Sequence, residues 1–320
     1  MDYKTLKQAK KIYADGRNVV EFLKGKQEFK QNASEFIEIA YDLQAGSYIA
    51  DVTEHHERYE RYSDELATLI QPHLREQASV LDIGTGELTT LTLILNKLRV
   101  PRLQVLAFDI SWSRLFKGRQ FLQRNCQREM SSLNLFVADI NAIPLCSKSV
   151  DVITSVHALE PNGKNLPKLL SELFRVAKDK CILFEPCYEL NSRKGQLRMD
   201  RHGYIKNVEG SVRQLGGKVL EFKLLKNILN PLNPTGYFLI EPSGDSSGKE
   251  RTTPEFSIPG TDLPLSTEGM FLGSPETGLL FPVLEGIPLL RREYGILGTA
   301  FFDDMQSPSE TIPVVVPKLE

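Results

Sequence analysis

The sequence predicts an α/β protein in which a doubly wound, mostly parallel sheet follows N-terminal helices and precedes a small β domain. From residue 79 onward, short apolar runs alternate with stretches of helical periodicity, which indicates a parallel sheet covered by helices on both faces. Beyond residue 255 this alternation stops, and short apolar runs separated by glycines and prolines indicate a separate β unit.

Residues 1–75 are predicted to be helices that form an extension or lid. Around Ser34, apolar residues recur at helical spacing. Ser63 is expected to cap a later helix, because acidic residues and then apolar ones follow it. Tyr41 and Tyr48 are candidates for closing the lid over a ligand, although packing is the favoured role for Tyr41.

The strands are predicted from apolar runs bounded by turn residues. Helices are expected between the first and second, the second and third, and the fourth and fifth of them. The last two are joined by a short loop with two prolines, which suits an antiparallel hairpin because a parallel pair needs a long crossover. The expected strands cover residues 79–83, 103–109, 133–139, 150–156, 181–185, 218–225 and 237–240.

The chain divides by composition into five segments. They are a helical extension at 1–75, a ligand-binding α/β domain at 76–241, a Ser- and Gly-rich linker at 242–255, a small β domain at 256–302 and an extended tail at 303–320.

Composition excludes several classes of protein. Lys and Arg number 39 and Asp and Glu 41, so a net charge of −2 argues against a dedicated nucleic-acid binder. No apolar run reaches the roughly 20 residues of a membrane span, and the charged start lacks a signal peptide's apolar stretch. The four cysteines lack metal-like spacing. We therefore expect a cytoplasmic protein without a membrane partner; a protein partner or a homodimer stays open.

The most informative motif is VLDIGTGELTTL, residues 80–91, where the first strand meets the first helix. Gly84 and Gly86 allow a tight turn and the close approach of a ligand. Asp82 at the mouth of this turn would repel the pyrophosphate of a dinucleotide but attract a cationic ligand. Thr89 replaces the third glycine of a dinucleotide motif. The turn therefore favours a ligand with positive charge and no phosphate.

Two further acids stand at strand ends. Asp109 ends the second strand, about 25 residues after the first glycine, where an acid typically accepts hydrogen bonds from ribose hydroxyls. Asp139 ends the third strand, within reach of an adenine amino group. Because the carboxyl ends of parallel strands meet at one crevice, these acids and Asp82 are expected to converge there.

In these motifs the chain resembles the class I S-adenosylmethionine-dependent methyltransferases. The resemblance covers about residues 35–241 and rests on VLDIGTGEL, LAFDIS, VADINAIP and GYFLI. It implies a seven-stranded sheet with an antiparallel edge hairpin, and S-adenosylmethionine as the cofactor. Where the family often has a third glycine this chain has Leu88, which puts the backbone path after Gly86 in doubt. The residues expected at the cofactor are Asp82, Gly84, Thr85 and Gly86 for the methionine end, Asp109 and Ile110 for the ribose, Asp139 and Ile140 for the adenine, and Tyr48 from the lid.

The ending GLLFPVLEGIPLL resembles the small zinc-ribbon-like domain that activates several tRNA and translation-factor methyltransferases. Such ribbons hold zinc with two Cys-Pro-x-Cys knuckles. The matching segments here, at 258–261 and 274–277, read IPGT and SPET, so all four thiolates are absent and we expect no metal. The hairpin should instead be held by Leu272, Leu279, Phe281, Val283, Ile287 and Leu289. The domain would either help to shape the substrate mouth or only cover apolar surface.

Methyl transfer is an in-line displacement, so the protein mainly aligns the two reactants and excludes water. His157 and Glu160 after the fourth strand are the catalytic candidates, and His157 is preferred as a base because its ordinary pKa lies near neutrality. The alternative is that His157 only lines the wall. Glu185 at the end of the fifth strand is a candidate for substrate binding.

The segment 189–206 after the fifth strand is basic, with Arg198, Arg201 and His202 as candidate substrate ligands. Such a cluster suggests a small anionic acceptor, phosphorylated or nucleotide-linked, although a solvated charged loop fits equally. The leading hypothesis is a methyltransferase acting on an oxygen or nitrogen atom of such a molecule. The alternatives are an RNA or protein methyltransferase with a fused activator-like domain, and a non-catalytic scaffold that binds S-adenosylmethionine.

Overall fold

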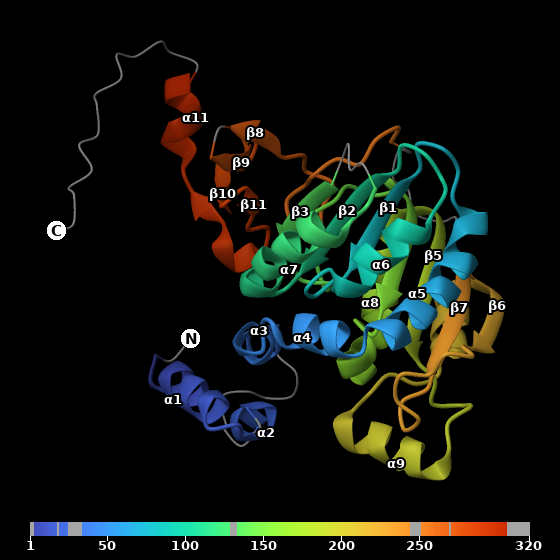
Figure 1. The fold of residues 1–320 in the computed structure, drawn as a ribbon. Helices are drawn as coiled ribbons and strands as arrows, with labels where there is room; N and C mark the ends of the chain where they lie inside the picture. The colour runs from blue at the N-terminus through green and yellow to red at the C-terminus, as the bar shows by residue number, and fades with distance from the viewer. Residues whose placement is uncertain are drawn as a thin grey trace.

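The computed structural model describes residues 3–17, 19–24, 34–128, 133–243, 251–268 and 270–305. Its centre is a seven-stranded sheet in the order β3-β2-β1-β4-β5-β7-β6 (Figure 1). The strands are β1 (Ser79–Ile83), β2 (Gln104–Asp109), β3 (Leu133–Val137), β4 (Val150–Val156), β5 (Ala177–Pro186), β6 (Lys218–Leu224) and β7 (Thr235–Glu241).

The direction of the strands agrees with the sequence pattern. β1 runs parallel to β2 and β4, β2 to β3, and β4 to β5. β7 is antiparallel to both β5 and β6, which confirms the predicted edge hairpin. β5 is longer than expected because it begins at Ala177, and of residues 177–180 only Ala177 is buried.

Helices cover both faces of the sheet, as predicted (Figure 1). Of the helices between strands, α6, α7 and α8 were predicted, whereas α9 and α10 form where a charged loop or no helix was expected. Their bounds are α6 (Thr89–Lys97), α7 (Trp112–Asn125), η2 (Glu160–Asn165), α8 (Leu166–Val176), α9 (Arg193–His202) and α10 (Val208–Gln214).

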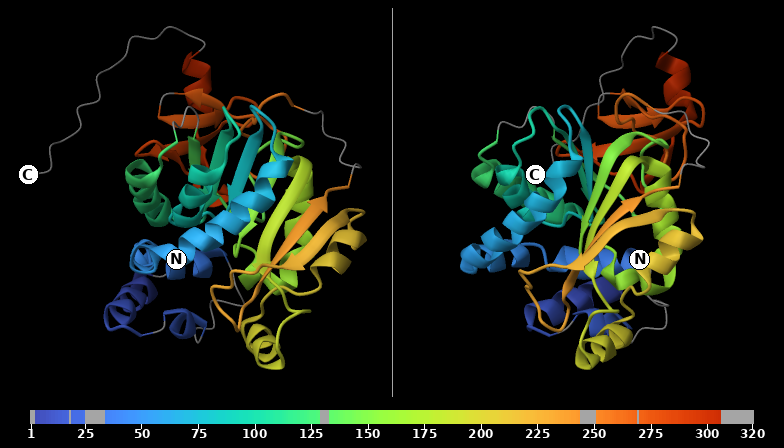
Figure 2. Two further views of the ribbon diagram at one scale, coloured as in Figure 1. Left: turned by 45° about the vertical axis from the view of Figure 1, so that its right-hand side comes forward. Right: turned by 90° about the vertical axis from the view of Figure 1, so that its right-hand side faces the viewer.

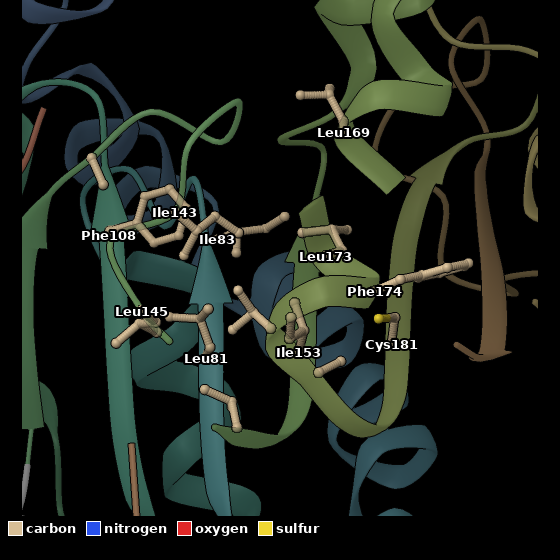
Figure 3. Close-up of a cluster of buried hydrophobic side chains, with 14 of the residues drawn as sticks. Leu81, Ile83, Phe108, Ile143, Leu145, Ile153, Leu169, Leu173, Phe174 and Cys181 are labelled. Atoms are coloured by element: carbon tan, nitrogen blue, oxygen red, sulfur yellow. The ribbon is translucent and has the colours of Figure 1, made fainter. Parts of the chain in front are cut away.

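The core forms two layers, one on each side of the sheet. β1 is buried along its whole length, and its side chains alternate between the two layers. Figure 3 shows part of the larger layer, where Leu81 and Ile83 of β1 face Leu169 and Leu173 of α8. A strand that is buried on both faces has a continuous apolar sequence, which is why β1 could be predicted from the sequence.

The N-terminal region is helical, as predicted, with one correction. Ser63 does not cap a helix: it lies fully buried in the middle of a helix that begins at His56. The local acidic pattern after Ser63 is surface charge on that helix. The elements are α1 (Tyr3–Ala14), α2 (Val19–Lys24), α3 (Ser34–Leu43), α4 (Ser47–Glu54), α5 (His56–Ile70) and η1 (Gln71–His73). Among the described residues, no helix combines the length and apolar character needed to cross a membrane.

A small second sheet lies beside β3, at the opposite edge of the main sheet from β6 (Figure 1). Its contact with β3 is a parallel bridge between Leu289 and Val137, with a hydrogen bond of 2.8 Å from the Leu290 N–H to the Val137 carbonyl. The edge of the main sheet is thereby covered. The elements are β8 (Ser266–Glu268), β9 (Phe271–Ser274), β10 (Leu279–Leu284), β11 (Ile287–Pro288), η3 (Arg292–Tyr294) and β12 (Ile296–Leu297).

The side chains predicted to hold this small sheet all join apolar clusters. Leu272, Leu279, Phe281 and Val283 pack with the core of the main sheet. Ile287 and Leu289 pack with residues of α7 and β3. The segment expected as an extended tail begins with a helix instead, α11 (Thr299–Met305), and residues 306–320 lie outside the described part. Residues 244–250 of the expected linker also lie outside it.

Because Phe281 is only 1% exposed and shares one core with the main sheet, Phe281→Ala should destabilise the whole chain. We expect a loss of about 3–5 kcal/mol in the free energy of unfolding, in a single cooperative transition followed by urea titration. The matched control is Leu297→Ala, whose side chain is 73% exposed and should matter little. Two separate transitions in the wild-type protein would contradict a shared core.

Candidate active site

A cavity opens at the carboxyl ends of the parallel strands, between the sheet and the lid helices α3 and α4. It lies at the place where open α/β sheets bind ligands. The nine residues that the sequence suggested for a cofactor all line this one cavity: Asp82, Gly84, Thr85, Gly86, Asp109, Ile110, Asp139, Ile140 and Tyr48.

The glycine turn after β1 needs left-handed backbone at three positions. Gly84 and Gly86 both have φ of +59°, which glycine adopts without strain. Leu88 has φ of +56° and begins α6 while its side chain is fully buried. A residue with a Cβ in this conformation costs about 1–2 kcal/mol. Leu88 therefore takes a backbone conformation that glycine adopts without strain, and its side chain is buried there.

The acids at the strand ends differ in their surroundings. Asp82 is buried and accepts a hydrogen bond of 2.8 Å from Thr154 Oγ1. Burial raises the pKa of Asp82 to about 6, against the effect of its hydrogen bonds. Asp109 accepts hydrogen bonds from the N–H groups of Gly86 at 2.9 Å and Ser111 at 3.0 Å. It therefore joins the glycine turn to the start of α7.

Two residues of this site were missed by the sequence reasoning. Glu87 is almost fully buried, and its two carboxylate oxygens accept hydrogen bonds of 2.9 Å from the N–H groups of Gly46 and Ile49. These groups lie at the start of α4, where an acid is favourable. Glu87 directly follows the GTG turn, so its place in the motif was the available signal.

Arg114 is the second missed residue. Its guanidinium lies between the lid tyrosines, 5.0 Å from the ring centre of Tyr41 and 4.8 Å from that of Tyr48. It also lies 3.6 Å from Asp109 and 4.0 Å from Glu87. The only local signal was that Arg114 sits three residues after Ser111, whose side chain caps α7. Its role depends on contacts between distant segments.

The charge of the cavity fits a cationic ligand. Four carboxylates line it, from Asp82, Glu87, Asp109 and Asp139, whereas Arg114 is the one arginine or lysine among its described lining residues. A ligand with a sulfonium and an ammonium is attracted by this balance, and a pyrophosphate is repelled. In the described part of the chain no cluster of three or more His, Cys, Asp or Glu side chains could hold a metal ion.

His157 lines the cavity after β4 with strained backbone, at φ of +58°. Its Nδ1 is 2.9 Å from Glu160 Oε2, and its Nε2 is 2.8 Å from Thr235 Oγ1. Burial alone would lower the pKa of His157, but the hydrogen bond and charge of Glu160 outweigh it and the pKa is raised. Both ring nitrogens are thus engaged within the protein.

Glu185 lies beneath the loop that carries His157, and its side chain does not line this cavity. It is fully buried, and Oε1 accepts hydrogen bonds of 3.0 Å from the N–H groups of Ala158 and Leu159. Burial raises the pKa of Glu185 to about 7, although the His157 charge and the hydrogen bonds oppose the rise. Glu185 thereby supports the loop that carries His157.

A second cavity adjoins the first and shares Ile37, Tyr41 and Pro161 with it. It lies between the N-terminal helices and the end of α9, which Figure 2 shows on the same side of the sheet. Glu160 and His202 line it, so two of the predicted residues meet here. Its other described lining residues are Tyr13, Gly16, Arg17, Val19, Phe36, Ala40, Gln44 and Tyr204.

The remaining basic candidates lie outside these cavities. Arg198 stacks on Tyr204, with 5.5 Å between its guanidinium carbon and the ring centre. Arg201 is exposed at the end of α9 and lines neither cavity. The basic segment therefore contributes through His202 and, indirectly, through Arg198.

Comparison with known proteins agrees with this site. Residues 80–180 match the family model described as a methyltransferase domain. That span runs from β1 to the start of β5 and includes Asp82, Asp109 and Asp139. Residues 80–180 are therefore assigned as a methyltransferase domain, and such a domain implies S-adenosylmethionine as the cofactor. No curated protein matches the sequence.

Several solved structures are similar in fold. An S-adenosylmethionine-dependent methyltransferase from Methanosarcina mazei has 16% identity and a TM-score of 0.46, covering 55% of this chain and 97% of that one. A chain from the complex of the Haloferax volcanii Trm112 methyltransferase activator with its proposed methyltransferase has 15% identity and a TM-score of 0.47, covering 63% and 97%. Likenesses this remote carry no argument about substrate.

The raised pKa of Glu185 gives a pH-dependent stability. Because its folded pKa of about 7 lies above its ordinary value of 4.5, folding binds a proton between these pH values, so stability falls as pH rises toward 7. Above pH 7 the buried charge of Glu185 costs about 3 kcal/mol of folding free energy. Glu185→Gln removes this cost, but it leaves an unpaired amide that costs about 1 kcal/mol.

We therefore expect Glu185→Gln to be about 2 kcal/mol more stable than the wild type at pH 8, with no gain at pH 4.5, measured by urea unfolding. Glu57→Gln, at a position 94% exposed, is the matched control. Equal stability of Glu185→Gln and wild type at both pH values would contradict a buried charge at this position.

Proposed function

We propose that the protein transfers a methyl group to an oxygen or nitrogen atom of a small acceptor that enters through the second cavity. The single observation behind this proposal is that the two cavities adjoin at Tyr41, Ile37 and Pro161. A donor in the first cavity and an acceptor in the second would meet there, sheltered from water by α3. Alignment and exclusion of water are the main requirements of methyl transfer.

In this proposal the residues of the first cavity hold the donor. Asp82 and the glycine turn would bind the methionine end, Asp109 the ribose hydroxyls and Asp139 the adenine. When bound, S-adenosylmethionine supplies an activated methyl carbon on a cationic sulfur. Tyr41 and Tyr48, fixed on either side of Arg114, would close the site from the lid.

His157 acts in this proposal as a positioning residue. Its two ring nitrogens are bound to Glu160 and Thr235, so neither is aimed at an acceptor. Its strained backbone instead sets the place of Glu160 at the border of the second cavity. An anionic group on the acceptor, phosphate or nucleotide-linked, would meet Arg17 and His202 on the cavity's walls.

A second candidate is an RNA or protein methyltransferase in which the C-terminal sheet is a fused, activator-like domain. Two turns favour this second candidate, and they lie at residues 258–261 and 274–277, the segments that match the zinc knuckles. Thr261 and Thr277 each close a turn with the residue three positions earlier, and each hydroxyl accepts a hydrogen bond from the N–H two positions later, at 3.2 and 3.3 Å. The two threonines thus close the two turns by local hydrogen bonds, whereas in a zinc ribbon a shared metal ion holds the corresponding turns.

This C-terminal sheet would act by holding the lid. Arg291 is 3% exposed and pairs with Glu38 of α3, and Tyr294 donates a hydrogen bond of 2.7 Å to the same carboxylate. An RNA acceptor would show steep salt dependence of binding through counterion release, and a small acceptor would not.

The donor site is tested by Asp109→Asn. We expect the affinity for S-adenosylhomocysteine, measured by calorimetry, to fall about 10- to 100-fold, since a charged hydrogen-bond acceptor is worth about 1.5–3 kcal/mol. Asp179→Asn, at an exposed position paired with Lys180, should bind like the wild type.

An Asp109→Asn protein that melts normally and binds the ligand as the wild type does would refute the assignment of this cavity. Tight binding by the wild type, with no turnover on any acceptor, would favour the third hypothesis of a non-catalytic scaffold.

A further inference from the structure

The second cavity has a chemical character that narrows the acceptor beyond the proposed function, on which this inference rests. Four Phe or Tyr side chains are among its described lining residues. Tyr13 comes from α1, Phe36 and Tyr41 from α3, and Tyr204 from the segment after α9. Such walls accommodate a flat apolar body and also attract a cation through the faces of the rings.

Glu160 is the one carboxylate among the described residues that line this cavity. It is held in place from two sides, because Oε2 accepts hydrogen bonds from His157 at 2.9 Å and from Asn233 Nδ2 at 3.0 Å. Its own backbone carbonyl accepts from the Ile205 N–H. The pKa of Glu160 is lowered: burial would raise it, but the His157 hydrogen bond and charge, with Tyr204 and Asn233, outweigh that. The carboxylate is therefore ionised at neutral pH.

Arg17, the arginine on the wall of this cavity, does not neutralise the charge of the Glu160 carboxylate. Arg17 is 62% exposed at its side chain and lies 3.4 Å from Asp15, so water and its neighbour screen it. His202 lies on the exposed end of α9, where its ring centre is 5.4 Å from that of Tyr204. The border with the first cavity is thus acidic and aromatic, while the outer wall is basic.

We propose that the acceptor is an arylalkylamine, an alkyl amine that carries an aromatic ring, whose nitrogen is seated between Tyr41 and Glu160, at the border of the two cavities. The amine binds as an ammonium opposite Glu160 and gives one proton to solvent before transfer. The freed lone pair then forms the N–C bond to the donor methyl as the C–S bond breaks and its electrons return to sulfur. Positive charge therefore moves from sulfur to nitrogen. Glu160 stabilises the charge where it develops, while Arg114 and Arg198 already lie over the rings of Tyr41 and Tyr204.

A hydroxyl acceptor fits the same walls less well. It would have to lose its proton to a base as the methyl arrives. Both nitrogens of His157 are already bound, and Glu160 already accepts bonds from His157 and Asn233. The tyrosines cannot serve as phenolate bases, since burial raises the pKa of Tyr41 and of Tyr204 above their ordinary value. An amine differs because it can lose its proton to solvent before the methyl arrives, so it needs no base within the site.

The test is binding of matched probes to the full chain saturated with S-adenosylhomocysteine. Phenethylamine and 2-phenylethanol share a ring and a two-carbon chain, and differ in the nitrogen or oxygen. We expect phenethylamine to bind at least about 10-fold more tightly, because an ionic hydrogen bond is worth about 1.5–3 kcal/mol. Equal binding of the two probes, or no binding of either, would overturn the proposal.

Two variants sharpen the test. Glu160→Gln should reduce the preference for the amine to about 2-fold while S-adenosylhomocysteine binds as in the wild type. The matched control is Glu209→Gln, whose carboxylate is exposed on α10 and pairs with Arg213. If Glu160→Gln fails to fold by its thermal melt, Tyr13→Ala replaces it. Tyr13 is exposed on α1, and its loss should weaken both probes about equally, about 3- to 10-fold.

The two proposals fail in different ways. A wild-type chain that does not bind S-adenosylhomocysteine contradicts the proposed function. Suppose instead that the folded Glu160→Gln variant binds S-adenosylhomocysteine and keeps its full preference for the amine. This result contradicts only the role of Glu160 and the amine assignment.

Discussion

The site depends on one carboxylate, Asp109, which links the glycine turn to the start of α7 and, through Arg114, to the lid. It accepts hydrogen bonds from the glycine turn after β1 and from the start of α7, and it lies 3.6 Å from Arg114. Arg114 in turn lies between Tyr41 and Tyr48 of the lid. The charge that we propose for a donor's ribose therefore also fixes the turn and, through Arg114, the lid.

The lid is fixed at further points. Glu87 binds the start of α4, Ser34 at the start of α3 donates a hydrogen bond to Asp139, and Arg291 of the C-terminal region pairs with Glu38 of α3. The Asp139 side of the cavity, the lid and the C-terminal sheet are thus connected through polar contacts. A change in the small sheet can reach the donor site through α3 without touching it directly.

Much of the fold could be predicted because its signals are local. β1 is a buried apolar run, the glycine turn is a short motif, and Asp82, Asp109 and Asp139 come at or just beyond the ends of successive strands. Parallel topology then requires the strand ends to meet. The antiparallel hairpin of β6 and β7 could be predicted from the short connection between the two strands.

What escaped prediction depends on contacts between distant segments. Arg114 and Glu87 look like ordinary surface charges until the lid is in place, and Ser63 resembles a cap because the buried face of α5 cannot be recognised locally. The bridge from Leu289 to the edge of β3 joins residues about 150 positions apart. The engagement of both His157 nitrogens likewise required the place of Thr235, on the last strand of the main sheet.

We infer that the acidic cavity above the glycine turn binds a cationic, phosphate-free donor. The most direct measurement is calorimetric titration of the purified chain with S-adenosylhomocysteine, alongside NAD. The account predicts one site with micromolar affinity for S-adenosylhomocysteine and no binding of NAD. Binding of NAD, or no binding of either ligand, would contradict it.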